Sequence, residues 1–431
     1  MNNLSTSKPS RMQNTWSNLP WGIFLFLLAV FVIATPLVHF GTGFAVRDAY
    51  DMAKAQSLSY WPRQVALISL GAFALFNLLR SKPGRLQING LLGWLILFYL
   101  VWAALSIIWS INPNFTIKRV GILLLFSLGA LYVADRLSLR ETIALVFFIC
   151  AVSVLLGAYP YVVYPASIKK LLLNASVRFG GNMHPIAQGW HCGLLLLSVF
   201  ALSKTAEQNR AVYLGIAFIA FLLLVLTRSR MAFASCIIGS AVYWALTSSK
   251  RYQGVLFLLG IIIGGCLIYF LLGHEFWSFF DNVTSLGRGG GIQIGSLTGR
   301  TPLWESLLHA IDQRPVAGYG YDITFFTRVE NLIGLKKELG WVAGSPHSGY
   351  LVTLLGLGYI GTVPLVLILI LSVTKSINLA RRNPEYAFVV AVLVWLIFNL
   401  VTEDQVLTRP YFPVFVWMIM LARLGFIREK R

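Results

Sequence analysis

The sequence predicts an all-α polytopic membrane protein with about 12 transmembrane helices, and three observations support this fold class. Apolar residues make up 57% of the 431-residue chain, and only 12% of the residues are charged, whereas about a quarter of a soluble domain is charged. The mean hydropathy is +0.73. The apolar residues are gathered into blocks of about 20, the length that a helix needs to cross the hydrocarbon core. This composition excludes a soluble enzyme.

Windows of about 19 residues place the membrane spans in order along the chain. The spans are 21–40, 65–79, 91–111, 120–134, 142–164, 185–203, 211–227, 231–247, 254–273, 349–373, 387–401 and 411–424. The first block is long enough to cross the bilayer and has no clear A-x-A cleavage site, so we interpret it as an uncleaved span rather than a signal peptide.

The distribution of Lys and Arg sets the orientation. With the N-terminus in the cytoplasm, 18 of the 35 basic residues lie on that side, and 17 lie on the other, 6 of them in the long loop. Long loops are largely exempt from the positive-inside rule, so the 6 basic residues of the long loop are set aside and the comparison is 18 inner against 11 outer residues. Both termini are therefore predicted to be cytoplasmic. The expected parts are a cytoplasmic tail at 1–20, helices 1–9 within 21–272, a periplasmic loop domain at 273–348, helices 10–12 within 349–424 and a tail at 425–431.

The net charge of +19 divides between the two faces. The 18 inner basic residues accompany 5 acids and the 17 outer ones accompany 11, so the inner face carries +13 and the outer face +6. Cytoplasmic anchoring explains the inner charge. The positive-inside rule disfavours basic residues on the outer face, so the net positive charge there indicates an anionic ligand on that side. The four cysteines all fall within spans, where they act as small apolar fillers.

Two outer motifs place cations at the start of a span. Lys118 and Arg119 precede the fourth predicted span, where interface anchoring competes with a substrate contact. Arg228 and Arg230 lie between two spans with almost no loop to spare. A helix start beside two arginines can bind phosphate, and anchoring to lipid headgroups is the alternative.

The long outer loop carries a third candidate. Its glycine-rich stretch at 287–291 fits no regular element, and as a nucleotide motif it is weak because no strand precedes it. Thr301 suits an N-cap and Pro302 the first helical position, so a helix is expected from Pro302 to Gln313. Its apolar residues share one face, which predicts an amphipathic helix at the membrane surface with Arg300 at its positive end.

His347 is the histidine with the best setting for chemistry. It lies in an outer loop at the mouth of the tenth span, and an ordinary histidine pKa of about 6.5 suits a general base. His184 and His191 are seven residues apart on one helical face, which is weak evidence for a metal. Because the outer segments lack an H-E-x-x-H motif, no divalent metal is expected.

These motifs, taken in order, resemble the O-antigen ligase and polymerase superfamily, and most closely its ExoQ-like exopolysaccharide polymerase branch. The resemblance covers roughly Leu222 to Leu407, and one departure is Pro-His-Ser-Gly where relatives often have Ala-His-Asn-Gly. The motifs are Ser229-Arg230, Ser296-Leu-Thr-Gly-Arg300-Thr301 with Trp304, Arg314-Pro-Val-Ala-Gly-Tyr-Gly320, Pro346-His347-Ser-Gly-Tyr350 and Leu354-Leu-Gly-Leu-Gly-Tyr-Ile-Gly361.

The resemblance implies a GT-C-like glycosyltransferase that uses no metal or cofactor and inverts the transferred sugar. The donor would be an oligosaccharide on undecaprenyl diphosphate, at the periplasmic face of the inner membrane. Arg230 and Arg300 match residues thought to hold the diphosphate, with Arg228, Lys118 and Arg119 as further candidates. His347 matches the base that deprotonates the acceptor.

Three alternatives stay open at this stage. The acceptor is a second lipid-linked repeat unit in a polymerase, with a chain-length regulator as a candidate partner, or a sugar of lipid A-core in a ligase. A flippase for the lipid-linked glycan is a different class, disfavoured because few ionisable residues lie at mid-membrane depth and no repeat of broken segments is visible. Asp48 or Asp51 could replace His347 as the base. No nucleic-acid partner is expected.

Overall fold

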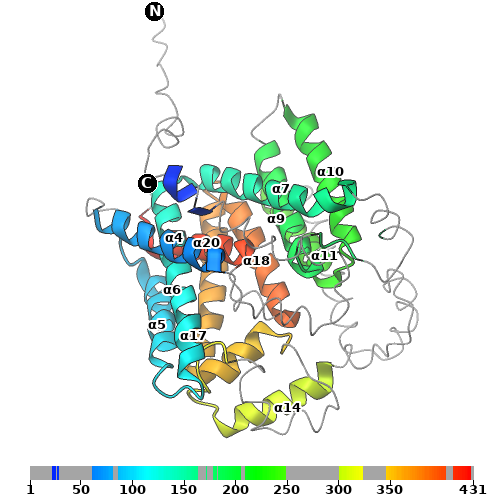
Figure 1. Ribbon diagram of the computed structural model, residues 1–431. Coiled ribbons are helices and arrows are strands. Elements are labelled where there is room, and N and C mark those ends of the chain that lie inside the picture. Colours follow the sequence, from blue (N-terminus) through cyan, green and yellow to red (C-terminus); the bar gives the residue numbers. More distant parts are fainter. Residues whose placement is uncertain are drawn as a thin grey trace, which may run out of the picture.

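The computed structural model describes residues 22–25, 27–28, 61–80, 86–163, 171, 178–181, 183–204, 209–248, 300–323, 346–403 and 411–428. Most of the span at 21–40, the span at 254–273, Asp48, Asp51 and the glycine-rich stretch at 287–291 lie outside these residues. The main helices, shown in Figure 1, are α4 (Trp61–Arg80), α5 (Gly90–Leu105), α6 (Pro113–Arg136), α7 (Leu139–Val163), α9 (Pro185–Ser203), α10 (Arg210–Leu226), α11 (Arg230–Thr247), α14 (Arg300–Gln313), α17 (Gly349–Ala380), α18 (Tyr386–Thr402) and α20 (Phe412–Phe426).

Each predicted span that falls within the described residues coincides with a helix. The bounds of α9 agree with the prediction at both ends. Helix α6 begins at Pro113 rather than Val120, because the side chain of Asn112 caps it by accepting from the Phe115 N–H (3.2 Å) and proline suits the first helical position. Five helices of the described part are long and apolar enough to cross a membrane, and five shorter ones are also apolar. The chain is therefore a membrane protein, and the count of 12 spans stays a prediction.

One end of the helix bundle, which we call the basic end, joins the end of α6, the start of α7, and the ends of α17 and α20. The Arg423 guanidinium in α20 donates to the Leu137 carbonyl (2.6 Å), and the Lys375 ammonium in α17 donates to the Leu424 carbonyl (2.7 Å). Cations here satisfy carbonyls at helix C-termini. They belong to the set that the positive-inside rule assigned to the cytoplasm.

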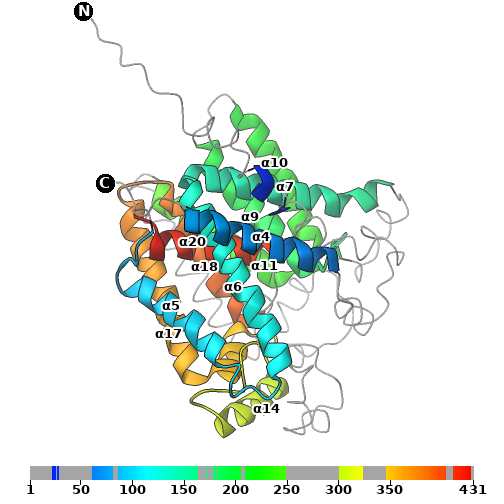
Figure 2. The ribbon, with the colours of Figure 1, turned by 60° about the vertical axis from the view of Figure 1, so that its left-hand side comes forward.

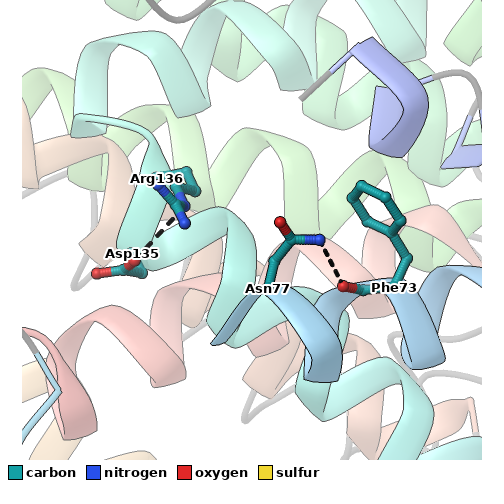
Figure 3. Close-up of polar contacts among 4 residues, drawn as sticks. All are labelled: Phe73, Asn77, Asp135 and Arg136. Atoms are coloured by element: carbon teal, nitrogen blue, oxygen red, sulfur yellow. Dashed lines mark hydrogen bonds and ion pairs between the residues drawn. The ribbon is translucent and has the colours of Figure 1, made fainter. Parts of the chain in front are cut away.

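Helices α4 and α6 carry two further polar contacts, shown in Figure 3. The Asn77 amide donates to the Phe73 carbonyl one turn earlier in α4 (2.9 Å), and Arg136 lies 3.8 Å from the Asp135 carboxylate in the last turn of α6. Each of these contacts pairs a polar side chain with a partner in its own helix, which lowers the cost of placing polar groups in an apolar environment.

A buried polar network joins α9, α11 and α18. The Trp190 indole donates to the Asn399 side-chain oxygen (2.9 Å), and the Asn399 amide donates to the Ser235 hydroxyl (2.8 Å). Paired polar side chains of this kind hold membrane helices together. Because Trp190 and Ser235 lie near the starts of their helices and Asn399 lies near the end of α18, the network places these three termini together. We call this opposite end of the bundle the site end, and it also holds the start of α17.

Helix α17 is broken in the middle, although the sequence predicted one continuous span. Gly358 has φ 63° and ψ −166°, far from helical values. The Tyr359 and Ile360 N–H groups donate instead to the carbonyls of Pro315 (2.8 Å) and Val316 (3.2 Å). Non-helical backbone is tolerated at membrane depth only where such groups are satisfied within the protein.

The segment 314–323 also donates hydrogen bonds to the α17 carbonyls that the break would leave without helical partners. Its Tyr319 and Gly320 N–H groups donate to the carbonyls of Leu355 (2.9 Å) and Gly356 (2.8 Å), the groups that Tyr359 and Ile360 would reach in an unbroken helix. The Trp102 indole donates to the next carbonyl, that of Leu357 (3.1 Å). The first turns of α17 are therefore a separate short helix held by this segment.

We expect Gly358→Ala to lower the unfolding temperature of the purified protein in nanodiscs. The positive φ disfavours any side chain, and an added Cβ would overlap the Val316 carbonyl, so we expect a loss of about 1–3 kcal/mol or more. Gly215→Ala in α10 is the matched control, because nothing lies within 4 Å of an added Cβ there. Equal unfolding temperatures for wild type and Gly358→Ala would contradict this account of the break.

Candidate functional site

The turn between α10 and α11 collects arginines at the site end. Arg230 is the first residue of α11, and Arg228 precedes it with φ 49°, a left-handed conformation that is uncommon outside glycine. The Arg228 guanidinium reaches the Leu171 carbonyl (3.4 Å). Arg178, which sequence reasoning did not single out, donates to the Thr227 carbonyl (2.9 Å). The turn therefore carries two arginines of its own, Arg228 and Arg230, and accepts a hydrogen bond from the guanidinium of a third, Arg178.

This turn has the features of an anion site. The Ser229 side chain makes no capping hydrogen bond to α11, so it leaves the first N–H groups of the helix uncapped. Arg230 is half-buried, and its Nε is buried without a hydrogen-bond partner in the described part of the chain. Uncapped N–H groups beside a guanidinium favour a phosphate oxygen.

His347 lies on the turn that enters α17. Its φ is 52°, and it stands between two fixed residues. On one side the Trp304 indole of α14 donates to the Pro346 carbonyl (3.0 Å). On the other, the Ser348 hydroxyl caps α17 by accepting from the Leu351 N–H (3.4 Å). The imidazole is half-buried, so part of it faces outward.

The start of α17 is packed closely on the end of α18. A Cβ on Gly349 would overlap Leu400, and the Tyr350 hydroxyl donates to the Ile397 carbonyl (3.3 Å). Since the Asn399 network ties α18 to α11, His347 and Arg230 are brought to the same end of the bundle from positions 117 residues apart in the sequence. The sequence could place each residue at a span boundary but could not show that both lie at the same end of the bundle.

Helix α14 is amphipathic as predicted, but its apolar face is covered by protein. It begins at Arg300, two residues earlier than expected, and both ribbon views show it at one edge of the molecule (Figures 1 and 2). Its apolar face packs against Tyr319, Ile323 and Leu355. The fully buried or nearly buried residues of that face are Leu303, Leu307, Ala310 and Ile311. Protein therefore covers this face, through α17 and the segment 314–323, and the position of α14 on or near the membrane surface stays a prediction. The Arg300 side chain lies outside the described part.

Lys118 and Arg119 lie in two different environments. The Arg119 Nε lies 3.0 Å from the Asp322 carboxylate, whose side chain is 1% exposed, and the guanidinium also lies over the Phe115 ring. This ion pair fastens α6 to the segment 314–323. Lys118 is exposed. Asp322 was not predicted as a partner, since no local pattern links it to a residue 203 positions earlier.

The polar groups near this ion pair do not offer a second base. Burial raises the pKa of the Tyr321 hydroxyl well above its ordinary value, the neighbouring Tyr99 and Asp322 raise it further, and Arg119 opposes them. Tyr321 therefore stays protonated at neutral pH. Burial likewise raises the pKa of Tyr319, with Arg314 lowering it.

The two histidines weighed as metal ligands have structural contacts. The His184 side chain caps α9 by accepting from the Ile186 N–H (3.3 Å), and the buried His191 ring contacts the Ala187 carbonyl (2.8 Å). In the described residues, no three or more His, Cys, Asp or Glu side chains are placed to hold a metal ion.

Comparison with known proteins assigns part of the chain to a family. Residues 215–366 match a family model described as O-antigen ligase. The matched segment contains most of α10, all of α11 and α14 and the broken first part of α17, and with them Arg228, Arg230, Arg300 and His347. Lys118 and Arg119 lie outside it. No curated protein matches the chain.

Proposed function

We propose that this chain, whose residues 215–366 match the O-antigen ligase family model, acts as a member of the O-antigen ligase and polymerase superfamily and transfers a glycan from undecaprenyl diphosphate to a sugar hydroxyl. The reaction takes place at the site end, on the periplasmic face of the inner membrane, and both chain termini are cytoplasmic. The product is a longer exopolysaccharide or O-antigen chain built from repeat units.

The observation that carries this proposal is the arrangement around Arg230. Its Nε is buried and without a partner at an uncapped helix start, and His347 is held at the same end of the bundle. A diphosphate leaving group gains negative charge as the sugar departs, and a guanidinium can bind that charge through paired hydrogen bonds. Arg230 and Arg300 are the proposed diphosphate ligands, and no metal is required.

The proposed reaction is a single displacement. The His347 imidazole accepts the proton of the acceptor hydroxyl, whose oxygen bonds to the anomeric carbon of the donor. The bond between that carbon and the diphosphate oxygen breaks, and undecaprenyl diphosphate leaves with the electron pair. One displacement inverts the anomeric configuration, and the energy comes from the activated donor.

The other cations have supporting parts in this proposal. Arg228 lies two residues from Arg230 and can contact the same anion. Lys118 is exposed and free to approach a headgroup, while the Arg119 charge is offset by Asp322. We therefore rank Arg230 and Arg300 ahead of Arg228, and Arg228 ahead of the Lys118–Arg119 pair.

A ligase is the second candidate, because the matching family model is described as O-antigen ligase. The two activities differ in the acceptor, and glycan analysis of a strain that lacks the chain separates them. Single repeats on the lipid A-core indicate a lost polymerase. A bare core with polymer still on its lipid carrier indicates a lost ligase. Donor confined to the cytoplasmic leaflet would contradict both and favour a flippase.

A further inference from the structure

A side-chain hydrogen bond joins α14 to the turn that carries His347. The Trp304 indole N–H donates to the Pro346 carbonyl at 3.0 Å. That carbonyl belongs to the peptide unit whose N–H is that of His347. Pro346 is buried and Trp304 is half-buried, so the bond is shielded from competition by water.

This bond bears directly on the conformation of His347. A residue other than glycine at φ 52° is strained and persists only where its surroundings hold it. The Ser348 cap anchors the residue that follows His347 to the start of α17, and the Trp304 bond holds the peptide unit that precedes His347. Rotation of the Pro346–His347 peptide plane would relieve the strain and redirect the imidazole, and the indole opposes that rotation.

The same indole links the two halves of the proposed site. Trp304 lies four residues after Arg300, one turn further along α14, so both residues start from the same face of that helix. Beside this bond, α14 contacts α17 through an apolar cluster that includes Leu307 and Leu355. The Trp304 bond therefore sets the register between the helix that begins with Arg300 and the turn that carries His347.

We infer that Trp304 is a positioning residue for the transfer reaction, which holds the His347 imidazole and the start of α14 in register through the Pro346 carbonyl. This inference rests on the proposed function, because it assigns Trp304 a role through His347. It predicts an effect on the rate of the chemical step rather than on donor binding or on folding.

The test uses the full chain in nanodiscs, with lipid-linked glycan extracted from the deletion strain as the probe. Trp304→Phe keeps an aromatic ring against the apolar cluster and removes the N–H. We expect kcat to fall about tenfold with KM unchanged, since misplaced catalytic groups cost rate rather than binding. Trp109→Phe is the matched control, because it also removes an indole bond to a backbone carbonyl, that of Ala317 (3.0 Å).

A combined variant separates a role through His347 from a general loss of structure. If Trp304 acts through His347, adding Trp304→Phe to His347→Ala lowers the rate no further than His347→Ala alone. Wild-type kcat in Trp304→Phe, beside an inactive His347→Ala, would overturn the inference and leave the proposed function standing. Wild-type activity in His347→Ala would overturn the proposed base itself.

A second substitution tests the same hydrogen bond if the Trp304→Phe protein does not fold. Benzothienylalanine at position 304 keeps the shape of the tryptophan and replaces its N–H with sulfur. The same fall in kcat is expected, and an unchanged kcat would overturn the inference.

Discussion

His347→Ala abolishes polymer formation, the lipid-linked donor accumulates, and the protein still inserts in the membrane. Loss of a general base lowers a rate by about 10²–10⁴-fold, and Tyr321, the buried hydroxyl on the neighbouring segment, cannot replace it because burial keeps it protonated. The expected result is measured by the length distribution of cell-surface glycan and by the amount of lipid-linked donor.

His309→Ala is the matched control for this prediction. His309 lies on the exposed face of α14 and is removed from the turn that enters α17. Both variants should reach the membrane in wild-type amounts, and only His347→Ala should lose polymer. Glycan chains of normal length in the His347→Ala strain would defeat the general-base proposal and leave Asp48 or Asp51 as candidates.

Arg230→Ala lowers the transfer rate by about 10²-fold or more, and Arg300→Ala does the same. Removing one donor that stabilises developing charge in a transition state costs about this much, and Arg230 offers a buried Nε with no protein partner among the described residues. The rate is measured with purified protein and extracted lipid-linked donor, in a buffer that contains EDTA.

Two further variants make this result specific. Arg230→Lys keeps the charge but loses the paired hydrogen bonds of the guanidinium, so we expect a partial loss that lies between wild type and Arg230→Ala. Arg210→Ala removes an exposed arginine at the start of α10, away from the α10–α11 turn, and should leave the rate unchanged. Wild-type rates in Arg230→Ala would remove that residue from the site.

The positions of the helices follow from the sequence, but the break in α17 does not. Apolar blocks and caps set the bounds of α9 and the start of α14 to within two residues. The pairing of Gly318–Gly320 with Gly356–Gly358 depends on backbone contact between segments about 38 positions apart. Closely spaced glycines in both segments were a signal for close approach, but the sequence does not specify their register.

The residues of the candidate site also differ in how far a sequence pattern indicates them. His347, Arg228 and Arg230 could be proposed as site residues from the sequence because each is a polar residue at a span boundary, where neither the membrane nor a soluble surface explains it fully. Trp304, Arg178 and Asp322 act through backbone carbonyls or a distant ion pair. Such contacts leave no periodicity or spacing in the sequence, so only the three-dimensional arrangement identifies them.

The proposed function requires the site end to bind the diphosphate of a lipid-linked glycan. A density map of the full chain in nanodiscs with undecaprenyl diphosphate tests it most directly. We expect the diphosphate at the start of α11, within hydrogen-bond distance of Arg230 and Arg300, with His347 facing the oxygen that carries the sugar. Diphosphate density at the basic end, or none near α11 while the lipid is bound elsewhere, would contradict the proposed function.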